Sequence, residues 1–88
     1  MRLRNDRLSW REIEDGVVAL DLEKSSYFST NATGALLLQR LADAEASVDD
    51  LVRVLVGTYS IDEVTARSDV ARFVDLLGQQ GLLAGDHE

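Results

Sequence analysis

The hydrophobic pattern of the chain changes once, at Asn31-Ala32-Thr33-Gly34. Before this point, apolar and polar residues alternate in short runs, which is typical of strands with one buried and one exposed face. After it, apolar residues recur every three to four positions, which is typical of amphipathic helices. A chain of 88 residues can build one core only. The sequence therefore predicts a single domain, residues 1–88, of the α+β class.

Three short strands are predicted in the first third of the chain. The runs 8–14 and 17–23 flank Asp15-Gly16, a dipeptide that favours a two-residue hairpin turn. A second turn at 24–26 leads into a shorter third strand at 27–30. Hairpin connections of this kind produce an antiparallel meander, in which the first and third strands lie at the edges.

The second strand predicts which face of the sheet is buried. Val18, Leu20 and Leu22 share one face, and we expect Leu20 and Leu22 to support the core. Pairing across the predicted turn places Trp10 opposite Asp21. Trp10 then either covers the outer face or is redirected by a β-bulge.

Three helices are predicted after the strands, each preceded by a capping signal. The first spans 35–42 and follows Asn31, a good N-cap. The second begins at 47–50, where a serine precedes two acids, and the third begins at 60–63 with capping-box spacing. The third helix should run to about Gln80. Three strands followed by three helices give a winged-helix-like arrangement in which the helices cover the sheet.

Little in the sequence points to catalysis. There is no cysteine, and the one histidine, His87, is next to the last residue. Carboxylate pairs at Asp49/Asp50 and Asp62/Glu63 lie at predicted helix starts, which favours capping over acid–base chemistry or metal binding. The glycines are scattered and form no phosphate loop. We therefore expect no catalytic residue, no metal, no cofactor and no enzymatic activity.

Charge and hydropathy limit the partners. A net charge of −7 repels phosphate backbones, which disfavours nucleic acid. No apolar run reaches the roughly 20 residues that span a bilayer, and no signal peptide is visible, so we expect a cytoplasmic protein without a membrane partner. Residues 1–7 are expected to form a flexible basic arm that either aids solubility or contacts an acidic partner. Residues 84–88 are expected to form a flexible polar tail.

The predicted third strand favours a binding function. Edge strands are usually protected by lysine, proline or an inward charge, and residues 27–30 contain none of these. An open edge of this kind can accept an extended peptide as an additional strand. Alternatively, a helix of the same chain covers this edge, or the strand is too short to matter.

The third helix has an apolar arc that is broader than one packing contact needs. The arc comprises Val70, Phe73, Val74, Leu76 and Leu77. It is either core throughout, or core on one side and the wall of a groove on the other. In the second case Asp69 and Arg72 lie near the rim, where they could pair with charges on a bound peptide.

Several segments between residues 8 and 83 resemble the PqqD family of recognition elements for ribosomally synthesised, post-translationally modified peptides. These segments are 10–21, 27–34 (with the pattern Tyr-Phe-x-x-Asn-x-Thr-Gly), 47–52 and 73–77 followed by Gly81-Leu82-Leu83. A free-standing acidic chain of this size looks most like the discrete leader-binding proteins of lasso-peptide biosynthesis. The resemblance covers nearly the whole domain.

The resemblance implies a non-catalytic protein that binds the leader segment of a precursor peptide. The leader would add as a strand to the third strand and lie in a groove against the third helix, while a separate leader peptidase and a cyclase act on the precursor. The implied peptide-binding residues are the backbone of Tyr27, Phe28, Ser29 and Thr30 and the side chains of Asp69, Val70, Phe73, Leu76 and Leu77. Two other functions remain open: a winged-helix transcription regulator and a small dimerisation module.

Overall fold

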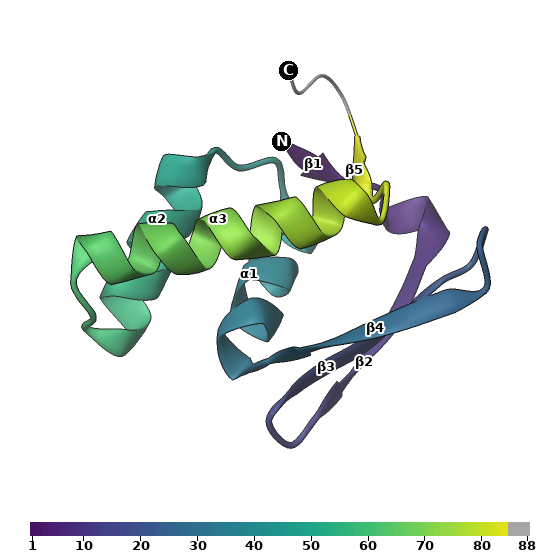
Figure 1. Ribbon diagram of the computed structural model, residues 1–88, viewed down its shortest axis with the longest axis horizontal. Helices are drawn as coiled ribbons and strands as arrows, with labels where there is room; N and C mark the ends of the chain where they lie inside the picture. The colour runs from purple at the N-terminus through teal and green to yellow at the C-terminus, as the bar shows by residue number, and fades with distance from the viewer. Residues whose placement is uncertain (85–88) are drawn as a thin grey trace.

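A three-stranded antiparallel sheet forms one layer of the molecule and three helices form the other (Figure 1). The computed structural model describes residues 1–84. Along the chain the main elements are β2 (Leu8–Ile13), β3 (Gly16–Asp21), β4 (Ser26–Asn31), α1 (Ala32–Asp43), α2 (Val48–Tyr59) and α3 (Glu63–Gln79). The predicted α+β class and winged-helix-like order are confirmed. Within residues 1–84, no helix is long and apolar enough to cross a membrane.

A second, two-stranded sheet joins the two ends of the described chain. It pairs β1 (Arg2–Leu3) with β5 (Leu83–Ala84), and a 3-10 turn at Asn5–Arg7 leads from β1 into β2 (Figure 1). Leu3 is buried, and the N-terminal amino group donates a hydrogen bond to the carbonyl oxygen of Ala46 at 2.8 Å. Residues 1–7, expected as a flexible arm, are thus packed on the domain. The rest of the predicted tail, residues 85–88, lies outside the described residues.

The β2–β3 hairpin is shifted by two residues from the predicted register. Glu14 and Asp15 form the turn, and Ile13 pairs with Gly16, which belongs to β3. A Cβ atom at Gly16 would lie 1.8 Å from the carbonyl oxygen of Thr30. This glycine is therefore required by the close approach of the β4 backbone and not, as predicted, by the turn.

The shift also settles the position of Trp10. Its cross-strand partner is Ala19, a fully buried residue, instead of Asp21. Trp10 therefore lies on the side of β2 that faces the helices, where it is partly buried against the core. The β2–β3 register is continuous, so no bulge redirects the indole.

The buried face of β3 is the opposite of the predicted one. Val17, Ala19 and Asp21 are fully buried. Leu20 is only half-buried, and Leu22 is 54% exposed in the turn that follows β3. The expectation that Leu20 and Leu22 support the core was therefore wrong. Assigning the buried face from hydrophobic residues alone fails on β3, because Asp21 is buried too. Its carboxylate is surrounded by enough hydrogen-bond donors to make this burial possible.

The helix starts follow the predicted capping signals, with one difference. Asn31 caps α1, and Ser47 and Asp50 form a reciprocal capping box at α2. The cap of α3 is Asp62, whereas Ser60, predicted as the start of the third helix, adopts a left-handed conformation (φ 56°) that ends α2. Because Ser60 closes the preceding helix, the capping role moves two residues along the chain.

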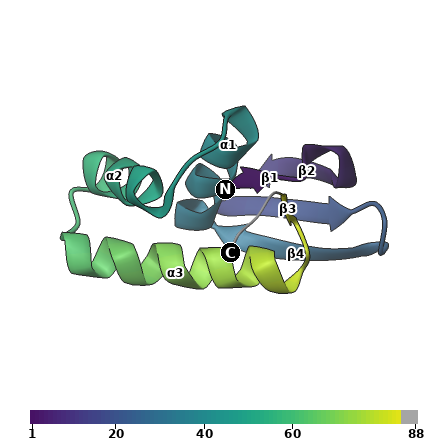
Figure 2. The same cartoon turned by 90° about the horizontal axis from the view of Figure 1, so that it is seen from above.

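The core lies between the sheet and the helices and is mostly leucine, valine and alanine. On α3 the predicted apolar arc divides into two groups. Val70, Phe73 and Leu77 are buried, as is Ala66 one turn before them, whereas Val74 and Leu76 are half-buried. Seen from above, α3 runs alongside β4, the edge strand of the sheet (Figure 2). This placement positions the candidate site.

Candidate functional site

β4 is an open edge strand. It pairs with β3 on one side, and within residues 1–84 no strand lies on its other side. The strand is six residues long and carries no charged residue and no proline. Both features that the sequence predicted for the third strand, its edge position and its lack of protection, are present in the structure.

Backbone alternation identifies which β4 residues face the open side. The amide of Leu22 donates to the carbonyl oxygen of Arg7 at 2.7 Å, so the even-numbered residues of β3 bond toward β2. The odd-numbered residues of β3 therefore bond toward β4, where Ala19 is paired with Phe28. The backbone amide and carbonyl of Phe28 therefore form hydrogen bonds with β3. The amides and carbonyls of its neighbours Tyr27 and Ser29 point to the open edge.

A groove of about 260 Å³ lies between the β4 edge, the start of α1 and one side of α3. Five of the nine residues predicted as peptide-binding line it, and they come from both walls. These residues are Ser29, Thr30, Asp69, Phe73 and Leu76. The two features that the sequence suggested independently, an open edge and a helical wall, therefore meet at one place.

The side chains of the other four predicted site residues do not line the groove. Val70 and Leu77 are fully buried in the core, and Phe28 is half-buried against it. Tyr27 is 74% exposed on the face of the sheet that points away from the helices. The two buried residues follow from helix geometry, because positions 66, 70, 73 and 77 form the stripe that faces the core. The neighbouring stripe, positions 69, 72 and 76, faces the groove.

The junction between β4 and α1 supplies groove residues that the sequence analysis did not propose. They are Asn31, Thr33, Gly34 and Leu37. A Cβ atom on Gly34 would lie 2.7 Å from the Cβ of Thr30, so this glycine lets α1 approach β4 closely. Asn31 and Gly34 both belong to the Tyr-Phe-x-x-Asn-x-Thr-Gly pattern, which was the available signal for this part of the site.

Charge is confined to the rim of the groove. Arg72 forms an ion pair with Asp69 one turn away on α3. The Arg72 side chain is largely exposed, while deeper in the groove Leu37 and Phe73 are buried. Such an exposed pair contributes little to stability, but it can affect the register and the association rate of a charged ligand.

The C-terminal end of α3 is tied to the sheet by hydrogen bonds to backbone carbonyl oxygens. Arg7 donates to the carbonyl oxygen of Gly81 at 3.0 Å, and Lys24 donates to that of Gln80 at 3.2 Å. Lys24 belongs to the β3–β4 turn, next to the edge strand. These contacts fix the helical wall of the groove relative to β4.

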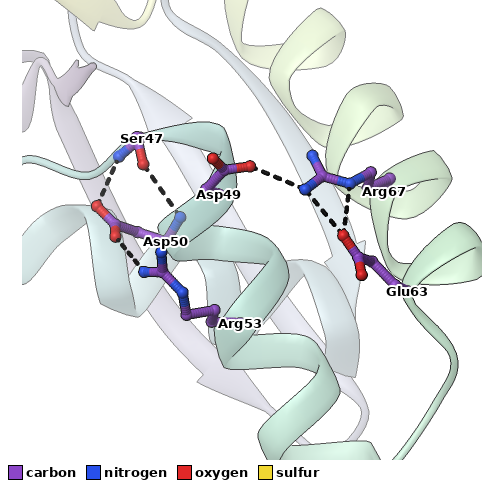
Figure 3. Close-up of polar contacts among 6 residues, drawn as sticks. All are labelled: Ser47, Asp49, Asp50, Arg53, Glu63 and Arg67. Atoms are coloured by element: carbon purple, nitrogen blue, oxygen red, sulfur yellow. Dashed lines mark hydrogen bonds and ion pairs between the residues drawn. The ribbon is translucent and has the colours of Figure 1, made fainter.

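Asp49, Asp50 and Glu63, at the starts of α2 and α3, cap or join these helices (Figure 3). Hydrogen bonds from Ser47 lower the pKa of Asp50, and Arg67, bonded to Asp49 and Glu63, ties the N-terminal ends of α2 and α3 together. Figure 3 shows Asp49 extending from α2 toward Arg67 on α3, with Ser47, Asp50 and Arg53 together at the start of α2. Within residues 1–84, no three acidic or histidine side chains are arranged to hold a metal ion.

Comparisons with known proteins agree with this geometry. The model of the family described as coenzyme PQQ synthesis protein D (PqqD) matches residues 16–83. The fold matches TbiB1, solved in complex with the TbiA(beta) leader peptide, with a TM-score of 0.84 and 27% identity over 100% of both chains. It also matches a lasso peptide synthetase B1 complexed with a leader peptide, with a TM-score of 0.76 and 32% identity over 96% of both chains. The comparison with curated proteins gives no match. With the family model covering most of its length, this chain belongs to the PqqD family.

Proposed function

We propose that this protein is a non-catalytic binding module for the leader segment of a ribosomally synthesised precursor peptide. The observation that carries the proposal is the position of the open β4 edge directly beside the groove under α3. The two similar solved proteins are complexes with leader peptides, which supports the same ligand class here.

The proposed binding mode is β-strand addition. Tyr27 and Ser29 each offer one amide donor and one carbonyl acceptor to an incoming strand. Alternate side chains of that strand then point toward α3, where Phe73 and Leu76 give the groove an apolar wall. Backbone pairing supplies affinity for any extended segment, and the groove supplies selectivity among sequences.

The module would act by delivering its ligand. A leader held on β4 keeps the attached core segment at a high local concentration for any enzyme that also contacts the module or the precursor. We propose a separate leader peptidase and a cyclase of lasso-peptide maturation as these enzymes. This division of labour suits a chain whose sequence offers little for catalysis.

The direct experiment is a titration of the fluorescently labelled cognate leader peptide with this protein alone, followed by anisotropy. We expect saturable binding, and a scrambled peptide of the same composition should not bind. A leader that fails to bind saturably in the absence of the enzymes would overturn the proposal.

The winged-helix transcription regulator finds no support in the described residues. Arg67 and Arg72 are the basic residues of α3, and both are paired with carboxylates. A recognition helix needs free basic side chains for phosphates and bases. A gel-shift assay at low salt should therefore show no binding to duplex DNA.

A further inference from the structure

The face of the sheet that points away from the helices carries apolar side chains that are exposed or half-buried. Tyr27 and Ile13 are exposed, and Val18 and Leu20 are half-buried. Together with Ser9, Trp10 and Arg11 they line an open hollow of about 610 Å³. Nothing in residues 1–84 covers Tyr27, which is 74% exposed. Contiguous exposed apolar side chains of this kind usually mark a contact surface.

The register of the sheet places Tyr27 at the end of one cross-strand row. Leu20 of β3 lies directly opposite Tyr27, and Ser9 of β2 lies opposite Leu20. The backbone of Tyr27 also points to the open edge. A strand added there must therefore continue this row with one of its own residues, at the ordinary strand spacing of about 4.8 Å.

Side chains that are opposite each other in neighbouring strands lie on the same face. The leader residue opposite Tyr27 thus extends over the outer face, whereas the residues before and after it point into the groove beside α3. We infer that the leader is read on both faces of the extended sheet, and that an aromatic or β-branched leader residue packs on Tyr27. This inference rests on the proposed leader-binding function.

The leader is the occupant that the geometry favours for this part of the face. Tyr27 belongs to the strand that would bind the leader, so the leader's outward side chain contacts it without any further partner. The neighbouring row gives an internal contrast. It ends at Ser29, a short polar side chain, opposite Val18. The preference should therefore appear opposite Tyr27 and be absent two residues along the leader.

A displayed library of random peptides tests this without knowledge of the natural leader. Selection on the wild-type protein should enrich an aromatic or β-branched residue flanked by groove-facing apolar positions. Selection on Tyr27→Ser should lose that preference and retain the flanking ones. Because Tyr27 is largely exposed, the variant should fold, and circular dichroism verifies this.

Two labelled synthetic peptides then measure the contact. One carries the selected residue opposite Tyr27, and the other carries serine there. Tyr27→Ser should weaken the first by up to about fivefold, as expected for one cross-strand pair, and leave the second unchanged. Equal effects on both peptides, or no effect on either, would overturn the inference.

The Ser29→Pro variant separates this inference from the proposed function. If the library yields no peptide that binds wild type better than Ser29→Pro, leader binding at the β4 edge itself fails. If such peptides are obtained but Tyr27→Ser leaves their enriched pattern unchanged, only the inference that a leader residue packs on Tyr27 fails, and leader binding at the β4 edge stands. A change of molar mass in light scattering on Tyr27→Ser would assign Tyr27 to self-association and would also overturn the inference.

Discussion

Arg7 donates a hydrogen bond of 2.8 Å to the carboxylate of Asp21, which joins the N-terminal turn to the buried end of β3. The same guanidinium donates to the carbonyl oxygen of Gly81, just after α3. One side chain thus holds the sheet and the end of the groove-lining helix together. The amides of Glu23 and Lys24 complete the shell of donors around Asp21.

This shell makes stability depend on pH. Burial by itself raises the pKa of Asp21, but hydrogen bonds from the Lys24 and Glu23 amides and from Arg7, with the charge of Arg7, outweigh it and lower the pKa below its usual value. A carboxyl whose pKa is lower in the folded state stabilises the fold above its unfolded pKa of about 4. This contribution is lost as the pH falls from about 4 through the lower folded-state value.

We predict that Asp21→Asn lowers the free energy of unfolding at pH 7, because Arg7 loses its buried anionic partner. The loss of stability on acidification below about pH 4 should also become shallower than in wild type. Urea denaturation at pH 7 and pH 3 measures both effects. The control is Asp15→Asn in the exposed β2–β3 turn, which should behave like wild type. Identical pH dependence in Asp21→Asn and wild type would contradict the prediction.

Gly34 is predicted to be required for the junction between β4 and α1. Gly34→Ala places a Cβ atom 2.7 Å from the Cβ of Thr30, so the fold should lose about 1–3 kcal/mol of stability. The matched control is Gly57→Ala in α2, where the new Cβ meets nothing within 4 Å. That change should stabilise the protein by about 0.5–1 kcal/mol. Thermal denaturation of both variants gives the comparison, and equal destabilisation would refute the role of Gly34.

Leu76 and Val74 are both half-buried on α3, but only Leu76 lines the groove. Leu76→Ser should weaken leader binding by about two- to fivefold, because full burial of a leucine contributes about 1.5–3 kcal/mol and a leader can bury only the part of Leu76 that is still exposed. Val74→Ser removes packing against the core, so it should lower the unfolding midpoint and leave the affinity close to wild type. Anisotropy and thermal denaturation of the two variants test this, and the reverse ranking of affinities would rule out α3 as the groove wall.

Much of the fold follows from local patterns in the sequence. Alternation before Asn31 and helical periodicity after it predict the order of elements, and the uncharged segment 27–30 predicts the open edge. The packing of Leu3 was missed because a two-residue strand is too short to show a period. Its partner, β5, lies some 80 residues away in sequence, at Leu83–Ala84.

The main errors in the site are faces assigned to the wrong side, on β3 and on α3. The two-residue shift of the β2–β3 hairpin is not their cause, because an even shift keeps Trp10 on the same face as Asp21 and changes only its cross-strand partner. The buried face of β3 was misassigned because Asp21 is buried through its hydrogen bonds, which hydrophobicity does not report. On α3, one broad apolar arc contains both the core stripe with Val70 and the groove stripe with Leu76. Tertiary packing alone separates these two stripes.

The open β4 edge is tested most directly by proline substitution on the two edges of the sheet. Ser29→Pro removes an amide that faces the open side of β4, and it leaves the bonds between β3 and β4 in place. Glu12→Pro is the matched control, because by the same alternation the Glu12 amide faces the open side of β2. Both variants should keep the circular dichroism spectrum of wild type.

Isothermal titration of the cognate leader peptide into wild type, Ser29→Pro and Glu12→Pro is the decisive measurement. We predict a loss of affinity of at least about tenfold for Ser29→Pro, because its missing donor leaves a leader carbonyl unpaired at the interface. Glu12→Pro should bind like wild type. A folded Ser29→Pro protein that binds the leader as tightly as wild type would contradict strand addition at β4.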